Sequence, residues 1–165
     1  MDFLFPYPPV GFHFAVAFQL FPQLTADFRF QEVSGLEMEM EMDTFTEGGQ
    51  NRFNWQLPKR TRYSDLVLKR GMFIGSGIIL WCQNAFENFV FEPTNITITL
   101  LNDQHLPVQA WYVVNAIPKK WSISNFNAQE SSVVIESITL SYQFFNVINM
   151  ESVASGVASG IAGAV

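Results

Sequence analysis

The chain has 165 residues and a mass of 18.8 kDa, the size of a single domain. Charged residues make up only 15% of it, whereas it holds 17 Phe, 4 Trp and 4 Tyr, a composition that excludes disorder over most of its length. The formal charge of −6 disfavours binding to nucleic acid or anionic lipid, and a lone cysteine, Cys82, excludes an internal disulfide and a cysteine-based zinc site. So few charges and so many aromatic groups indicate that part of the surface meets other protein.

The chain opens MDFLFPYPPV, with no basic residue before its apolar ones. This pattern differs from that of a secretory signal peptide. No apolar run reaches the roughly 20 residues that a bilayer span requires. We therefore expect synthesis in the cytoplasm and no membrane insertion by the subunit itself.

Alternation of period two predicts strands at Phe12 to Gln19 and Asp27 to Val33, followed by a break at Ser34-Gly35. The cleanest alternation is Leu36 to Met42, where one face carries Leu and Met and the other carries Glu37, Glu39 and Glu41. Like charges so close repel, so the glutamate face is expected to stay wet while Met38, Met40 and Met42 pack inward.

A Gly-Gly pair marks Thr46 to Asn51 as a loop. Arg52 to Leu57 is predicted to be a strand that Pro58 ends, and a further strand runs from Leu66 to Gly71. Helical spacing is confined to one stretch, whose secure part is about residues 78–89.

The second half of the chain returns to strand patterns. Thr94 to Leu101 is a strong β segment, and Val108 to Asn115 and Lys119 to Ile123 are predicted strands split by Pro118. Ser132 to Asn146 forms one long strand or two abutting strands. The fold class is therefore mainly β, an antiparallel barrel or sandwich with one flanking α-helix.

The C-terminus differs in composition, since Ser152 to Val165 consists of Gly, Ala, Ser and small apolar residues. We expect a β domain over residues 1–147 and a tail over 148–165 that is mobile or orders on a partner.

Candidate chemistry is sparse. The sequence has no P-loop, dinucleotide-binding or zinc-protease motif, and His13, His105 and Cys82 are interpreted as structural. Neighbouring glutamates of the acidic row would lie about 6.6–6.8 Å apart along a strand, too far to converge on a metal without other strands. We expect no catalytic residue, no metal and no cofactor.

The basic residues Lys59, Arg60 and Arg62 cluster after Pro58 in an otherwise acidic chain. A solvated turn is one interpretation, and a basic edge that meets the acidic surface of a neighbouring subunit is another. A nucleic-acid patch is disfavoured, because it would come with a wider basic face.

Three segments together resemble one known family: FQEVSGLEMEMEMDTFTEGGQN, LPKRTRYSDLVLKRG and NAIPKKWSISNFNAQESSVVIESITLSYQ. They are similar to the tail tube proteins of contractile phages and phage-tail-like particles, which are related in fold to the Hcp tube of type VI secretion. The resemblance covers roughly Val10 to Val147.

The resemblance implies hexameric rings stacked into a hollow tube inside a contractile sheath, joined to baseplate proteins and conducting cargo. It also implies that the subunit is made in the bacterial cytoplasm and ends in a phage or phage-tail-like particle. We predict that Glu37, Glu39 and Glu41 face the lumen. The segment from Phe45 to Pro58 corresponds to a loop that reaches neighbouring subunits or rings, a role assigned to Gly48, Gly49, Asn51 and Leu57.

Two alternatives stay open. The chain could be a baseplate-proximal tube initiator of the same fold, because its Phe- and Pro-rich start and its C-terminal tail depart from the family pattern. The other is a solitary β-barrel that binds a small apolar ligand, which the aromatic content permits.

Overall fold

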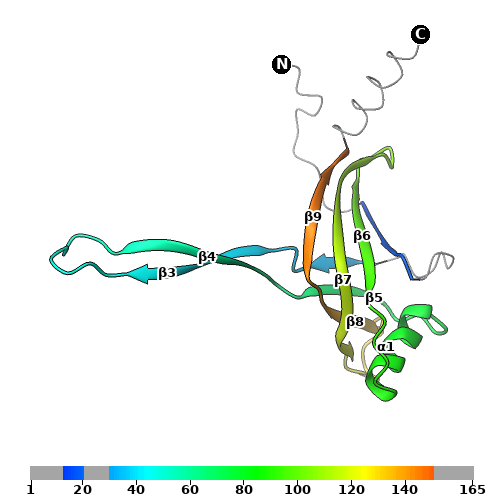
Figure 1. Ribbon diagram of the computed structural model, residues 1–165. Helices are drawn as coiled ribbons and strands as arrows, with labels where there is room; N and C mark the ends of the chain where they lie inside the picture. Colours follow the sequence, from blue (N-terminus) through cyan, green and yellow to red (C-terminus); the bar gives the residue numbers. More distant parts are fainter. Residues whose placement is uncertain (1–12, 21–29, 151–165) are drawn as a thin grey trace, which may run out of the picture.

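The computed structural model describes residues 13–20 and 30–150, and these form two β layers, one helix and a projecting hairpin (Figure 1). One layer holds β1 (Phe14–Phe18), β6 (Thr94–Leu101) and β9 (Phe144–Asn149). The other holds β2 (Glu32–Ser34), β5 (Leu66–Gly71) and β8 (Ile135–Ser141). The long strand β7 (Pro107–Ile123) belongs to both layers. The remaining elements are α1 (Gly77–Glu87), β3 (Met38–Phe45) and β4 (Trp55–Tyr63).

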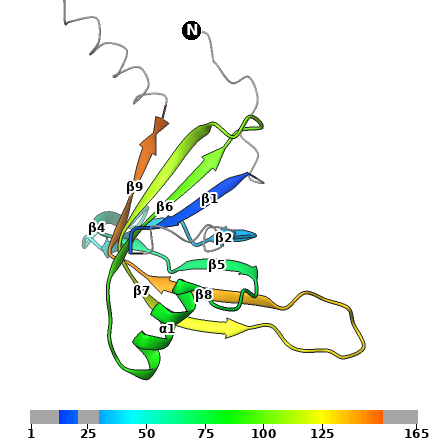
Figure 2. The same ribbon diagram turned by 90° about the vertical axis from the view of Figure 1, so that its right-hand side faces the viewer.

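Strand β7 links the two layers, as Figure 2 shows from the side. Its first half pairs with β6 and β9, and its second half pairs with β8. The expectation that Pro118 splits this segment is wrong. The register shifts between Pro118 and Lys120, so the proline lies at a β-bulge, where a missing N–H is tolerated.

The predicted fold class is confirmed as a mainly antiparallel β protein with a single helix in the described part of the chain. The two layers make an open, sandwich-like arrangement, and the described strands form no closed barrel. The strands expected from Leu66, from Thr94 and within Ser132 to Asn146 are present. The last of these segments is two strands, β8 and β9.

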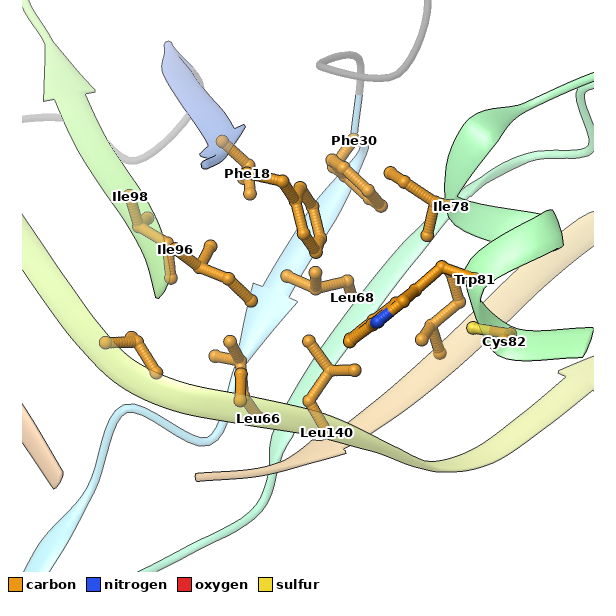
Figure 3. Packing of buried hydrophobic residues seen from close by; sticks show 14 of the residues in the cluster. Phe18, Phe30, Leu66, Leu68, Ile78, Trp81, Cys82, Ile96, Ile98 and Leu140 are labelled. Carbon is orange, nitrogen blue, oxygen red and sulfur yellow. The ribbon is translucent and has the colours of Figure 1, made fainter. Parts of the chain in front are cut away.

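The core lies between the layers and α1 (Figure 3). Leu66 and Leu68 of β5 meet Ile138 and Leu140 of β8 in register, and all four side chains are fully buried. Helix α1 closes one end with side chains at helical spacing, which the sequence predicts: Ile78, Trp81, Cys82 and Ala85.

Local hydrogen bonds and backbone conformation explain where α1 begins and where it ends. The Ser76 side chain accepts a hydrogen bond from the Ile78 N–H, which caps the N-terminus. At the other end the helix stops at Glu87, two residues before the predicted end, because Phe89 adopts a positive φ of 55°. The Asn88 and Val90 N–H groups then both donate to the Asn84 carbonyl and close the last turn.

Several expectations fall outside the described residues. These are Phe12, residues 27–29 of the predicted strand Asp27 to Val33, and the tail Ser152 to Val165. Strand β9 continues to Asn149, past the expected domain boundary at residue 147.

Candidate assembly interface

The β3–β4 hairpin is anchored at its base by aromatic packing. The Tyr63 ring lies 6.0 Å from the Tyr142 ring and 5.4 Å from the Phe145 ring, centroid to centroid. Beside them the Ser64 hydroxyl donates to the Glu37 carboxylate at 3.1 Å. From this base the hairpin leaves the body of the molecule (Figure 1), and the nine residues of β4 correspond to a length of about 30 Å.

Strand β4 is longer than the sequence predicts. Pro58 was expected to end it, and this is wrong, because β4 runs through Pro58 to Tyr63. The strand pairs on one side only, with β3, and such an edge strand accepts proline. The register also shifts between Met40 and Met42, so β4 contributes an extra residue beside Glu41.

One face of the hairpin carries charges of both signs. Residues directly opposite each other in a pair of strands share a face. In the strand register Glu39 lies opposite Arg62, and Asp43 lies opposite Leu57. The acidic row and the basic run, distant in sequence, are therefore brought together. Glu37 precedes β3 and lies at the base of the hairpin, apart from this face.

The basic residues form ion pairs within the hairpin. Arg60 Nε lies 2.8 Å and Arg62 Nε 3.3 Å from the Glu41 carboxylate, and Lys59 Nζ lies 3.4 Å from Asp43. The hydrogen bond from Arg60 holds the pKa of Glu41 below its usual value. The three cations therefore lie in a strand and not in a solvated turn, and they neutralise part of the acidic row.

The opposite face carries the methionine row. Met38, Met40 and Met42 are 55%, 47% and 53% exposed, so the expectation that they pack inward is wrong. The alternation itself was correct, but β3 and β4 pair only with each other and present no face to the core. A two-stranded ribbon is marginally stable alone, and an exposed apolar row on it indicates a partner surface.

The end of the hairpin is a small aromatic cluster. The Phe53 and Trp55 rings meet edge to face at 5.2 Å, and Phe45 lies directly opposite Trp55. All three side chains are about half exposed, and Arg52 beside them is exposed. We call these four residues the hairpin tip. The sequence predicts a loop over Thr46 to Asn51 and a strand over Arg52 to Leu57, whereas β4 begins at Trp55, and the pattern does not indicate the aromatic cluster.

The residues expected to contact neighbours lie along this end. Gly48, Gly49 and Asn51 are exposed in the connection between β3 and β4, and Leu57 is half exposed within β4. Gly49 has a φ of +92°, a conformation that favours glycine, and no atom lies within 4 Å of a Cβ added there.

A second apolar surface surrounds α1. Ile74 is 87% exposed and Phe89 82% exposed, and the Phe89 and Phe91 rings meet at 5.0 Å. The charged residues Glu87 and Glu92 are exposed beside them. We use the name α1 patch for the exposed large apolar side chains within α1 or within four residues of its ends, apart from Phe73: Ile74, Leu80, Phe86, Phe89, Val90 and Phe91. The sequence signal for it was the run FENFVFEP, which has more apolar residues than one helix face can bury.

The sheets also end in open edges. Within residues 13–20 and 30–150, β1, β2 and β9 each pair with a neighbour on one side only. Unpaired N–H and C=O groups along such an edge are ready to pair with another chain.

The groups considered for chemistry have structural surroundings. Burial raises the pKa of the Cys82 thiol to about 12, which makes it a poor nucleophile. The His13 and His105 rings lie 5.2 Å apart, centroid to centroid, at an interplanar angle of 52°, a contact that the sequence does not predict. No cluster of His, Cys, Asp and Glu in the described segments could hold a metal ion, and the described helix is too short to cross a membrane.

The fold and its exposed surfaces define a structural subunit of an assembled particle. Residues 10–146 match the model of the family described as T4-like virus tail tube protein gp19. The match covers most of the chain, and the chain therefore belongs to this tail tube family.

Solved structures agree with this assignment. A chain of the anti-feeding prophage baseplate is 29% identical with a TM-score of 0.80, covering 88% of this chain and 98% of that chain. A chain of the sheath–tube complex of the extracellular contractile injection system PVC is 24% identical with a TM-score of 0.73, covering 87% and 93%. Hcp1 from Flavobacterium johnsoniae shares the fold at 11% identity and a TM-score of 0.50, covering 82% and 94%.

The comparison with curated proteins gives no match. The family and the solved neighbours establish a tail tube protein of the contractile injection type with an Hcp-like fold, part of a phage or phage-tail-like particle. Such proteins are structural, and the chain is not an enzyme.

Proposed function

We propose that this chain is the repeating subunit of the inner tube, assembled as hexameric rings that stack into a hollow conduit. The observation that carries the proposal is the β3–β4 hairpin, which projects from the body with both faces exposed. A ribbon of two strands with an apolar row needs a surface from another molecule to be stable. A neighbouring subunit of the same assembly supplies that surface.

Ring closure also accounts for the open sheet edges. Strands β1, β2 and β9 each leave one side without a neighbouring strand in the described part of the chain. A heterologous contact between copies, repeated around a closed ring, covers such edges in every subunit at once. The low charge content of the chain suits a subunit whose sides are covered by its neighbours.

We assign the charged face of the hairpin to the lumen. Glu39 and Glu41 lie on this face, and Glu37 lies at the base of the hairpin beside Ser64. Ion pairs with Arg60 and Arg62 make this wall mixed in charge, less acidic than the three carboxylates alone. A hydrated, charged wall lets cargo pass without adhering.

The basic residues then act chiefly within the subunit. Lys59, Arg60 and Arg62 remain well exposed, and exposed ion pairs are weak enough to exchange partners. The three cations can therefore also bind acidic side chains of a neighbouring subunit at the subunit boundary. Gly48, Gly49, Asn51 and Leu57 lie toward the outer end of the hairpin, where the proposal places contact with an adjacent subunit or ring.

The remaining partners follow from the assembly. The tube is made from subunits synthesised in the bacterial cytoplasm, starts on baseplate proteins, and lies inside a contractile sheath that drives it through a target envelope. The solved relatives support this setting, because they come from a baseplate and from a sheath–tube complex.

Electron microscopy of the purified chain tests the proposal. We expect hexameric rings with a central hole at high protein concentration, and stacks of rings in isolated particles. Native mass spectrometry gives the subunit number independently. A chain that stays monomeric at high concentration, in particles without tube density, would contradict the proposal; bound lipid-like mass would favour the solitary ligand-binding barrel.

The second candidate is the tube initiator at the baseplate. The observation that favours it is the 29% identity to a chain of the anti-feeding prophage baseplate, against 24% for the sheath–tube complex. The copy number in purified particles separates the two candidates. An initiator is present in one or two rings, whereas the main tube subunit is present in every ring along the particle.

A further inference from the structure

We propose that the hairpin tip of one copy docks on the α1 patch of a second copy, with Arg52 facing Glu87 and Glu92. The inference rests on the proposed function, because it names the two surfaces that meet when copies of this chain assemble. Neither surface has a partner element of its own among the described residues, since both consist mainly of exposed apolar side chains.

The two surfaces match in chemistry. The tip has three half-exposed aromatic side chains, Phe45, Phe53 and Trp55, and one exposed cation, Arg52, which precedes Phe53 in the sequence. Phe53 and Trp55 meet edge to face, which leaves ring faces free for further aromatic contacts. Aromatic residues and arginine are enriched at protein interfaces relative to the rest of a protein surface.

The patch presents the complementary charge. Phe89 and Phe91 also meet edge to face, and the exposed carboxylates of Glu87 and Glu92 lie on either side of them in sequence. No ion pair within the described residues involves either carboxylate or the Arg52 guanidinium. Opposite charges on two apolar surfaces attract each other and fix how the two surfaces align when they meet.

Phe89 adds an independent argument. It follows the last turn of α1 at a positive φ of 55°, a position where glycine is usual. A bulky side chain there strains the backbone, and its ring is left 82% exposed. Phe89 closes the last turn of α1 and its ring meets the Phe91 ring, yet most of the Phe89 ring stays exposed, so we interpret it as a contact for a partner.

The placement of the surfaces requires two copies. The hairpin tip and α1 lie on opposite sides of the body, and the side view in Figure 2 agrees with Figure 1. One chain therefore cannot join its own tip to its own patch. A contact between different surfaces of identical copies repeats indefinitely or closes into a ring, and both geometries suit a tube.

Charge reversal tests the contact in the full chain. Arg52→Glu alone, and Glu87→Arg with Glu92→Arg, are each expected to raise the concentration needed for assembly at least about tenfold, because like charges then meet. Combining all three substitutions restores opposite charges and is expected to restore assembly. Lys120→Glu, an exposed cation outside both surfaces, is the matched control and leaves assembly unchanged.

Cysteine cross-linking reads the contact directly. A chain carrying both Arg52→Cys and Glu92→Cys is expected to give a ladder of linked oligomers on oxidation, whereas each single variant has no cysteine across the contact and is expected to give no ladder. The native Cys82 is buried and does not contribute. Circular dichroism of each variant confirms that the monomer is folded, since the substituted side chains are exposed.

The outcomes separate this inference from the proposed function. Tubes that form equally well in wild type and in every reversed variant overturn the inference and leave the proposed function standing. Loss of assembly without rescue by the combined variant also overturns it, as does a patch variant that assembles normally and loses only sheath binding. A wild-type chain that never assembles overturns both.

Discussion

Arg70 and Glu136 form a buried ion pair at the centre of the fold, with Arg70 Nε 2.9 Å from Glu136 Oε2. The two residues are directly opposite in the β5–β8 register, and they are 2% and 0% exposed. Trp121 Nε1 donates to the other Glu136 oxygen at 2.7 Å, and Arg70 also donates to the Ser76 hydroxyl. Since Ser76 caps α1, the pair joins both strands to the helix.

Removing one partner of this pair leaves the other charge buried. Arg70→Met is therefore expected to lower the free energy of unfolding by about 3–5 kcal/mol. Lys69→Met is the matched control, because Lys69 is the adjacent residue of β5 and its pair with Glu32 is exposed. That variant is expected to lose less than about 1 kcal/mol. Urea denaturation of both variants measures the difference, and equal losses would contradict the assignment.

This pair shows how far sequence patterns reach. Alternation places Arg70 on the face of Leu66 and Leu68, and Glu136 on the face of Ile138, so each charge was visible on an apolar face. Their pairing depends on the register of two strands far apart in sequence, which alternation does not encode. Local periodicity therefore predicts the strands and α1. It does not predict which residues pair when the two partners lie in segments far apart in the sequence.

The hairpin illustrates the same limit. The sequence predicted opposite faces of methionine and glutamate, and the structure has both. It did not predict that the methionine face lies outside the core. Alternation shows that a strand has two different faces, but not what packs against each face. It also did not predict that the basic run pairs with Glu41, since the bulge that aligns them is a property of two strands together.

The methionine row should matter for assembly and not for monomer stability. Met40→Glu places a charge in the middle of this apolar face, so we expect loss of rings and tubes by electron microscopy. The free energy of unfolding of the monomer should change by no more than about 0.5 kcal/mol, because the side chain is exposed. Met40→Leu keeps the face apolar and should still assemble. Normal tubes from Met40→Glu would exclude this face from the interface.

The pKa of Glu41 should depend on Arg60. Its hydrogen bond lowers the pKa of that carboxyl below 4.5, so pairing is complete above that value and is lost as the pH falls through the lower folded pKa. In Arg60→Gln the pKa should rise toward 4.5, measured by an NMR titration of the carboxyl carbon. Lys120→Gln is the control and should leave the titration where it was. An unchanged midpoint in Arg60→Gln would show that this ion pair is absent in solution.

The buried thiol of Cys82 predicts a loss of stability at alkaline pH. Its pKa rises from 9.0 to about 12 on burial, so the unfolded chain releases its proton first. Stability is fully present below pH 9.0 and falls between that value and the folded pKa, by about 1.4 kcal/mol at pH 10. Urea midpoints at pH 8 and pH 10 measure this loss. The Cys82→Ala variant should show a smaller drop between the two pH values, and an equal drop would assign the loss to other groups.

Two glycines with the same backbone angle should respond differently to alanine. Gly35 and Gly49 both have a φ of +92°. At Gly35 an added Cβ would overlap the Asp65 backbone oxygen, whereas at Gly49 it would meet no atom within 4 Å. Gly49→Ala therefore carries only the cost of the left-handed conformation, about 1 kcal/mol.

Gly35→Ala carries this cost and also forces the backbone near Asp65 to move. The Gly35 carbonyl accepts a hydrogen bond from the Tyr142 hydroxyl at 3.3 Å, so the shift would reach the aromatic base of the hairpin. We expect a total loss of about 2–4 kcal/mol in the free energy of unfolding. Urea denaturation of the two alanine variants gives the comparison. Equal losses would mean that the contact with Asp65 relaxes without cost, and that Gly35 is required for its backbone angle alone.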